Sequence, residues 1–363
     1  MIPRPFFQAA RQPGSQAALS ILLVFVFTLI APIQVFAANP SATLFPFATY
    51  SSDSGLAGGI KHFVYDIPEP GAHFESFEYL SLNGQFIWEL LLSKQLQNGS
   101  FDRLRLQTQN YQTYFYGTGN SNNPSLRGRF TVPQVDLSYQ FGQRNPDHSL
   151  WALYAEAQFT SALGTDGSSL FSTVTGLNGG NAYHTGIRLG LDNLDRDENS
   201  LEGEYIAGQV EAVSGSHQYF QGAFDYRRYF KIDPDMYFAF RSYADMVAGD
   251  PALYQVPALG GANRLRGFSE GRFRDNSDFG FGVELRKDLV LPSDWHFPWP
   301  VQAAGFIDAG KVLPVLYTMT LDDFHASEGI GLRILLRPES VVRIDWGFGE
   351  DEQGIYFTFG QAI

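Results

Sequence analysis

An alternation of apolar and polar residues constrains this chain more than any other feature. It recurs in runs of about 9–15 residues, separated by clusters of Gly, Asn, Asp, Pro and Ser. In one run Phe279, Phe281, Val283 and Leu285 share a face, and glycine and charged residues share the other. After the first 37 residues no apolar stretch is long enough for a membrane-spanning helix, and no heptad or solenoid period appears. The pattern therefore predicts a chain built from β-strands.

Alternation alone does not say which face meets water, so a soluble β-sandwich and a membrane β-barrel both fit it. Three features favour the barrel. The runs reach the ~9–11 residues that a tilted spanning strand needs. Their polar faces mix glycine with charges of both signs, which suits a wet lumen. Many runs also begin or end in aromatic residues, as at Tyr114–Tyr116 and Trp295–Trp299, and the chain holds 32 Phe, 18 Tyr and 5 Trp.

We expect sixteen strands between residue 43 and residue 363. Asn83-Gly84 is a two-residue hairpin signal that separates the third strand from the fourth, and it makes the count even, as in bacterial barrels. The longest connections, 117–126, 161–181 and 248–276, all follow odd-numbered strands, so they would share one end of the barrel. The connection from Asp192 to Gly203 is long for the opposite end. The predicted fold is all-β: a transmembrane, sixteen-stranded antiparallel barrel of the outer-membrane type.

The first 37 residues have the layout of a secretory signal. Arg4 and Arg11 precede an apolar run from Ala18 to Ala31, and Val35-Phe36-Ala37 fits a cleavage site. The run is shorter than the ~20 residues of a spanning anchor helix, which is the alternative. We therefore predict a signal peptide at 1–37, a barrel at 38–363, and a location in the outer membrane of a Gram-negative-type bacterium.

Composition excludes several classes of function. The net charge of -13 argues against a nucleic-acid partner, and the absence of cysteine excludes disulfides and thiol chemistry. The seven histidines show no metal-ligand spacing, and neither a Gly-x-Ser-x-Gly elbow nor a phosphate-binding loop occurs. We expect no enzymatic activity, no metal and no cofactor.

One segment stands out for its charged residues. Arg266-Gly267-Phe268 lies in a loop of nearly 30 residues, between two strands whose polar faces carry Glu284 and Asp308. If that loop folds into the lumen, Arg266 has two carboxylate partners, and such pairs are stronger away from bulk water. Gly267 would permit a tight tip, and Phe268 would wedge it in place.

Several short motifs, in order, resemble the outer-membrane assembly and transport barrels of the BamA/TamA type, also called bacterial surface antigen barrels. They cover nearly all of the chain after the signal. The motifs are Leu44-Phe45-Pro46-Phe47, Ser54–Gly59, Tyr114–Asn120, Asp195-Arg196-Asp197 with Gly203, Arg266-Gly267-Phe268, and Phe306 with Asp308 and Gly310.

The resemblance implies a function and a set of site residues. Barrels of this type fold or translocate other outer-membrane proteins and use a weak seam between their first and last strands. Their sixth extracellular loop enters the lumen, which implies that Arg266 contacts Asp308, with Glu284 as a second acceptor. In the last strand, Gly354, Phe357 and Phe359 resemble the signal that the barrel assembly machinery reads, although the chain ends in Ile363 and not in an aromatic residue.

The sequence departs from the family pattern at its start. The first strand follows the signal so closely that no periplasmic POTRA domain fits between them. Two classes of function therefore remain: a reduced assembly or translocation factor, or a gated pore or structural outer-membrane protein without client proteins. The implied partners are outer-membrane lipid, unfolded outer-membrane or secreted proteins, and the assembly machinery during the barrel's own insertion.

Overall fold

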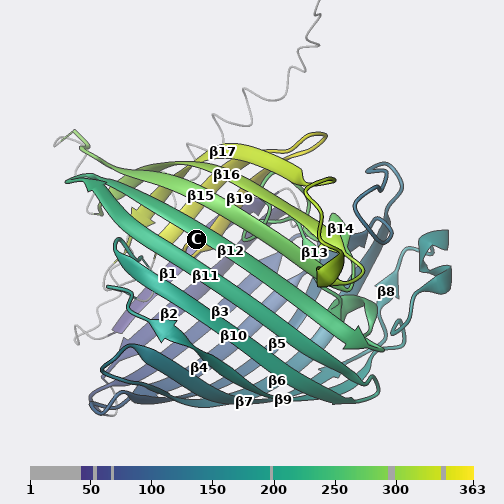
Figure 1. The fold of residues 1–363 in the computed structure, drawn as a ribbon, viewed down its shortest axis with the longest axis horizontal. Helices are drawn as coiled ribbons and strands as arrows, with labels where there is room; N and C mark the ends of the chain where they lie inside the picture. Colours follow the sequence, from purple (N-terminus) through teal and green to yellow (C-terminus); the bar gives the residue numbers. More distant parts are fainter. Residues whose placement is uncertain (1–41, 52–54, 67–68, 197–198, 293–298, 337–340) are drawn as a thin grey trace, which may run out of the picture.

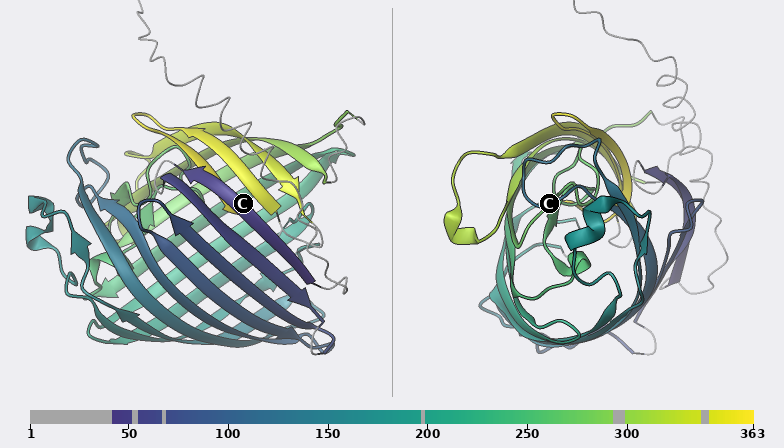
Figure 2. Two further views of the ribbon diagram at one scale, coloured as in Figure 1. Left: turned by 180° about the vertical axis from the view of Figure 1, so that it is seen from behind. Right: turned by 90° about the vertical axis from the view of Figure 1, so that its right-hand side faces the viewer.

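The computed structural model describes residues 42–51, 55–66, 69–196, 199–292, 299–336 and 341–363. Within these residues the chain forms one antiparallel barrel, with strands steeply tilted to its axis (Figures 1 and 2). The predicted signal at 1–37 lies outside the described residues, and so does most of the aromatic segment 295–299. No described helix has the length and apolarity needed to cross a membrane.

Sixteen long strands build the wall, as predicted, and each pairs with the next along the chain. They are β1 (Ala42–Ser51), β2 (Gly55–Tyr65), β3 (Ala72–Ser81), β4 (Phe86–Gln95), β5 (Ser100–Phe115), β6 (Gly128–Arg144), β7 (Ser149–Thr160), β9 (Gly180–Asp192), β10 (Gly203–Gly215), β11 (Tyr219–Asp233), β12 (Met236–Gly249), β15 (Ser277–Leu289), β16 (Val301–Leu313), β17 (His325–Leu335), β18 (Val341–Phe348) and β19 (Gln353–Phe359). The predicted hairpin at Asn83-Gly84 joins β3 to β4, and Gly84 has a φ of 79°.

The alternation in sequence becomes an inner and an outer face. On β6, Val135, Leu137 and Tyr139 point outward and are 42–48% exposed. Gln134 and Asp136 of the same strand point inward and are buried. An apolar outer belt around a polar lumen is the arrangement of a barrel that faces lipid.

The long connections share one end of the barrel, as their position after odd-numbered strands predicts. This end carries the short strands β8 (Gly164–Thr165), β13 (Ala258–Leu259) and β14 (Phe273–Arg274), at the right of Figure 1. The short helices η1 (Ser169–Thr173) and η2 (Leu253–Gln255) add Phe171 and Leu253 to a small apolar core with residues of β5 and β6. The connections are therefore packed against one another above the lumen.

The last strand is shorter than predicted. We expected a strand over 353–363, but β19 ends at Phe359, and Gly360 takes a φ of 78° that turns the chain inward. Ala362 and Ile363 are buried against Tyr229 and Ala239. Arg241 and Arg286 donate hydrogen bonds to the carbonyl oxygens of Ala362 and Ile363, at 3.0 Å each. These two arginines satisfy backbone oxygens that would otherwise pair in a longer last strand.

Candidate functional site

The loop of residues 250–276, between β12 and β15, folds into the lumen. β13 and β14 pair to form a small hairpin at its base. Four apolar side chains of the loop, Leu259, Leu265, Phe268 and Phe273, are at most 1% exposed and pack with Tyr243 and Val312 of the wall. Apolar burial therefore holds the loop inside, in addition to its charges.

Arg266 lies at the centre of this loop and makes the contacts predicted for it. Its Nε and Nη2 donate to the two carboxylate oxygens of Asp308, at 2.7 and 2.9 Å, and its backbone N–H donates to the same group at 3.2 Å. Its Nη1 donates to Glu284 at 2.7 Å. The guanidinium also lies over the ring of Phe306, 3.5 Å from its centre. A fork bonded in two places fixes orientation as well as charge.

Four further residues extend this pair into a buried network that sequence reasoning missed. Arg286 and Arg333 bind Glu284 at 2.8 and 2.7 Å, Arg333 binds Asp345 at 2.6 Å, and Arg343 binds Asp345 at 3.1 Å. Alternation places Arg333, Arg343 and Asp345 on the lumenal faces of β17 and β18. The alternation could therefore be read from the sequence, but it does not give the position of each side chain along the barrel axis.

Two glycines make room for the network's carboxylates. Gly282 pairs with Asp308 across β15 and β16, and Gly331 pairs with Asp345 across β17 and β18. A Cβ atom at Gly282 would lie 2.7 Å from Asp308 Oδ1. The glycines seen in the sequence on the polar faces therefore have a packing role here. Gly310, part of the thirteenth-strand motif, lies beside Leu259 of the loop.

The tip of the loop is bound to the last strand and to the turn that precedes it. Gly267 has a φ of 105°, and its N–H donates to the hydroxyl of Tyr356 on β19. That hydroxyl in turn donates to the carbonyl of Phe268 at 2.7 Å. Next to them, the Ser269 N–H donates to Glu352 at 2.7 Å. The tip therefore ties the loop to the strand that ends the barrel.

Arg266 stays charged in this setting. Burial lowers the pKa of its guanidinium, but the carboxylates of Asp308 and Glu284 outweigh burial and hold the pKa well above its ordinary value. The residues of the network are 0–3% exposed. The described residues hold no group of His, Asp or Glu side chains arranged to bind a metal ion.

The seam between the first and last strands is the second unusual feature. Each of the other neighbouring strand pairs forms a ladder, but no ladder joins β1 to β19 among the described residues. Phe45 and Phe47 lie on the face of β1 that continues the lumenal face of β2. They contact Phe357 and Phe359, which point outward from β19, with ring centres 5.0–6.1 Å apart.

The two ends of the sheet therefore overlap, with β1 outside β19. Figure 2 (right) shows the purple β1 beyond the yellow wall. Ile334, Leu336 and Val342 point outward but are only 1–8% exposed, and Phe45 packs against this cluster. Phe357 and Phe359, predicted as part of an assembly signal, lie in this overlap in the folded barrel. Gly354 lies inside, where an added Cβ atom would clash with the hydroxyl of Tyr356.

Comparison with known proteins places this architecture. The model of the Omp85 superfamily domain matches residues 181–363. No curated protein matches the sequence. Among solved structures, BamA from Haemophilus ducreyi lacking POTRA domains 1-3 is similar, with a TM-score of 0.59 and 13% identity over 88% of this chain and 70% of that chain.

Two CdiB structures are similar to the same extent. CdiB from Escherichia coli has a TM-score of 0.61 and 12% identity, and CdiB from Acinetobacter baumannii has 0.56 and 11%. Each match covers 88% of this chain but only 61% and 60% of the respective CdiB chain. At identities this low, the structural matches establish a shared fold and nothing more. The family match covers half of the chain, and together these findings confirm the resemblance at the superfamily level: the chain belongs to the Omp85 superfamily.

Proposed function

We propose that this protein is an outer-membrane barrel that inserts or translocates other proteins, and that its seam is where they engage it. One observation carries the proposal: β1 and β19 meet through aromatic side chains and not through a described backbone ladder. The apolar outer belt supports a location of the barrel in a lipid bilayer. Membership of the Omp85 superfamily supports the outer membrane as that bilayer.

An unpaired strand edge can accept another strand. Its free N–H and C=O groups form hydrogen bonds with an incoming extended segment, which supplies affinity without a specific sequence. A closed ladder would have to break first, at about 0.5–1.5 kcal/mol for each hydrogen bond. Within the described part of the seam, separating Phe47 from Phe357 and Phe359 breaks no backbone hydrogen bond. The seam is therefore the part of the wall that opens at the lowest cost.

The buried loop network keeps the rest of the wall rigid. Arg266 joins β15, β16 and β18 through Glu284, Asp308 and Asp345, and the tip of the loop binds Tyr356 on β19. Opening would then be confined to the movement of β1 and β2 away from β19. The packed connections above the lumen support this role over that of an open pore.

The role needs no catalytic residue and no cofactor. Its partners would be outer-membrane lipid and client proteins that are not yet folded. During its own insertion the barrel would be a client of the assembly machinery, through Gly354, Phe357 and Phe359. A gated pore or a structural protein without clients is the alternative that the experiment must separate.

The test is a seam that can be locked and released. The chain has no cysteine, so Phe45→Cys with Phe359→Cys introduces the only thiols. A reducible bifunctional thiol reagent then links β1 to β19. Cells depleted of the native protein and complemented with this variant are scored by a census of outer-membrane and secreted proteins. We expect locking to reduce the level of specific clients, and the reductant to restore it.

A matched control separates seam locking from chemical modification. Leu44→Cys with His62→Cys links β1 to β2, which already form a ladder at these positions. This variant should leave the census unchanged. An unchanged census after depletion of the protein itself would contradict a role in assembly or translocation and would favour the alternative.

A further inference from the structure

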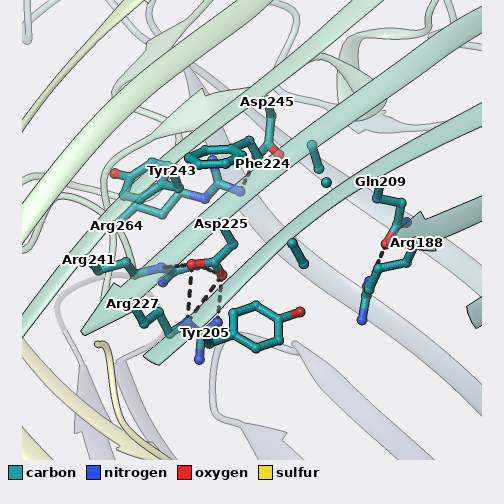
Figure 3. Close-up of a pocket in the computed structure, with 13 residues that line it drawn as sticks. Arg188, Tyr205, Gln209, Phe224, Asp225, Arg227, Arg241, Tyr243, Asp245 and Arg264 are labelled. Carbon is teal, nitrogen blue, oxygen red and sulfur yellow. Dashed lines mark hydrogen bonds and ion pairs between the residues drawn. The ribbon is translucent and has the colours of Figure 1, made fainter. Parts of the chain in front are cut away.

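A cavity of about 190 Å³ opens on the lumenal wall formed by β9, β10, β11 and β12 (Figure 3). It lies outside the loop network, although Arg264 of the same loop contributes to its lining. Two short side chains make the space. Ala207 of β10 pairs with Asp225 of β11, and Gln209 of β10 pairs with Ala223 of β11. Each of these two cross-strand pairs therefore contains one alanine. Longer side chains on either side surround the gap.

The cavity has more cations than anions. Arg188, Arg227, Arg241 and Arg264 line it, but the only carboxylates that do so are Asp225 and Asp245. Asp225 is shared, since Arg227 and Arg241 both bind it, at 2.6 and 3.0 Å. Arg264 reaches outside the lining to Asp278, at 2.7 Å. With Asp278 included, one positive charge is still in excess.

Arg188 is the cation that lacks a counter-ion. Its Nε donates to Gln209 Oε1 at 2.7 Å, and within the described residues no carboxylate lies at ion-pair distance from it. Gln209 in turn donates to Glu211, so the amide is held between the two charges. The terminal nitrogens of Arg188 are therefore left to whatever occupies the cavity. Figure 3 shows Arg188 across the cavity from Arg227 and Arg241.

We propose that this cavity binds an oxyanion, a phosphate or a carboxylate group. A guanidinium presents two parallel N–H donors that match the two oxygens of such a group. Arg188 supplies a pair of terminal N–H donors that is not occupied. Arg227 and Arg241 bind the same carboxylate, Asp225, so together these three residues add a net positive charge. The volume of about 190 Å³ suits an ion or the end of an acidic side chain.

Calorimetry on the purified barrel in detergent tests this, at constant ionic strength set with chloride. The probes are inorganic phosphate, glutarate and a tri-glutamate peptide. We expect at least one to bind, and Arg188→Gln to weaken that binding about tenfold, as loss of one charge-assisted fork would. Tighter binding of phosphate than of tri-glutamate would assign the site to a free ion, and the reverse would assign it to acidic segments.

A second variant, for which we expect tighter binding, distinguishes a specific effect from a loss of fold. Asp225→Asn removes the carboxylate that competes for Arg227 and Arg241, so it should tighten binding, which a misfolded barrel would not do. Arg105→Gln is the matched control: it removes a lumenal arginine that is paired with Glu89 on a distant part of the wall. No binding of any probe, unchanged affinity in Asp225→Asn, or an equal loss in Arg105→Gln would overturn the proposal.

Discussion

Replacing Arg266 by alanine should destabilise the barrel strongly, and the structure gives the reason. Glu284 would keep Arg286 and Arg333, and Asp345 would keep Arg333 and Arg343. Asp308 is different: among the described residues its ion pair is with Arg266, and it is 3% exposed. The substitution therefore leaves one buried carboxylate without its cation.

The expected cost is about 3–5 kcal/mol of unfolding free energy, the range for breaking a buried pair by removing one partner. Asp308→Ala should cost a similar amount. The double variant should cost less than the sum, because both substitutions remove the same interaction. Arg266→Lys should fall between wild type and Arg266→Ala, since it keeps the charge but loses the fork.

The assay is denaturant unfolding of the purified barrel in detergent, with heat-modifiable migration as a second readout. Arg105→Ala is the control, because its pair with Glu89 is 40% and 22% exposed and should contribute no more than about 1 kcal/mol. Additive costs for the two network substitutions, or equal costs for Arg266→Ala and Arg105→Ala, would show that Arg266 and Asp308 do not form a stabilising pair.

Three further substitutions test the loop tip, the packing and the seam. Tyr356→Phe removes the hydroxyl that bonds Phe268, so unfolding should become easier by about 1–3 kcal/mol while the fold is kept. Gly282→Ala should cost about 1–3 kcal/mol by overpacking, whereas Gly305→Ala, with nothing near its added Cβ, should cost far less in the same unfolding assay. Phe47→Ala should loosen the seam. In a Phe45→Cys background, which supplies the only thiol of the chain, a maleimide reagent should then label β1 faster than it does when Phe47 keeps its ring.

The strands were predictable because their signal is local. Period-2 alternation and the turn at Asn83-Gly84 depend on neighbouring residues, so the count of sixteen strands follows from the sequence. The inward turn at Gly360 is not local. It requires Arg241 and Arg286, on strands more than 70 residues away in the sequence, to donate hydrogen bonds to residues 362 and 363. The overlap of β1 on β19 likewise depends on how the sheet closes, which no single segment encodes.

The site was predictable in part for the same reason. The motif at Arg266 and the polar faces with Glu284 and Asp308 indicated an inward loop, and their contacts are present. Arg333 and Asp345 were visible as lumenal residues, but whether they reach Arg266 depends on the stagger between strands. That stagger is a property of the closed barrel, so these members of the network could only be found from the structure.

If client proteins engage the seam, a client can be trapped there by cross-linking in cells. A photoreactive amino acid at Leu44, an outward position on β1 that is 39% exposed, would be activated in cells during synthesis of outer-membrane proteins. Leu137 on β6 is the matched position, 48% exposed but in a strand with ladders on both sides. We expect adducts with unfolded proteins at Leu44, lost when the seam is locked, and none at Leu137. Equal capture at both positions, or no capture at Leu44, would contradict engagement of clients at the seam.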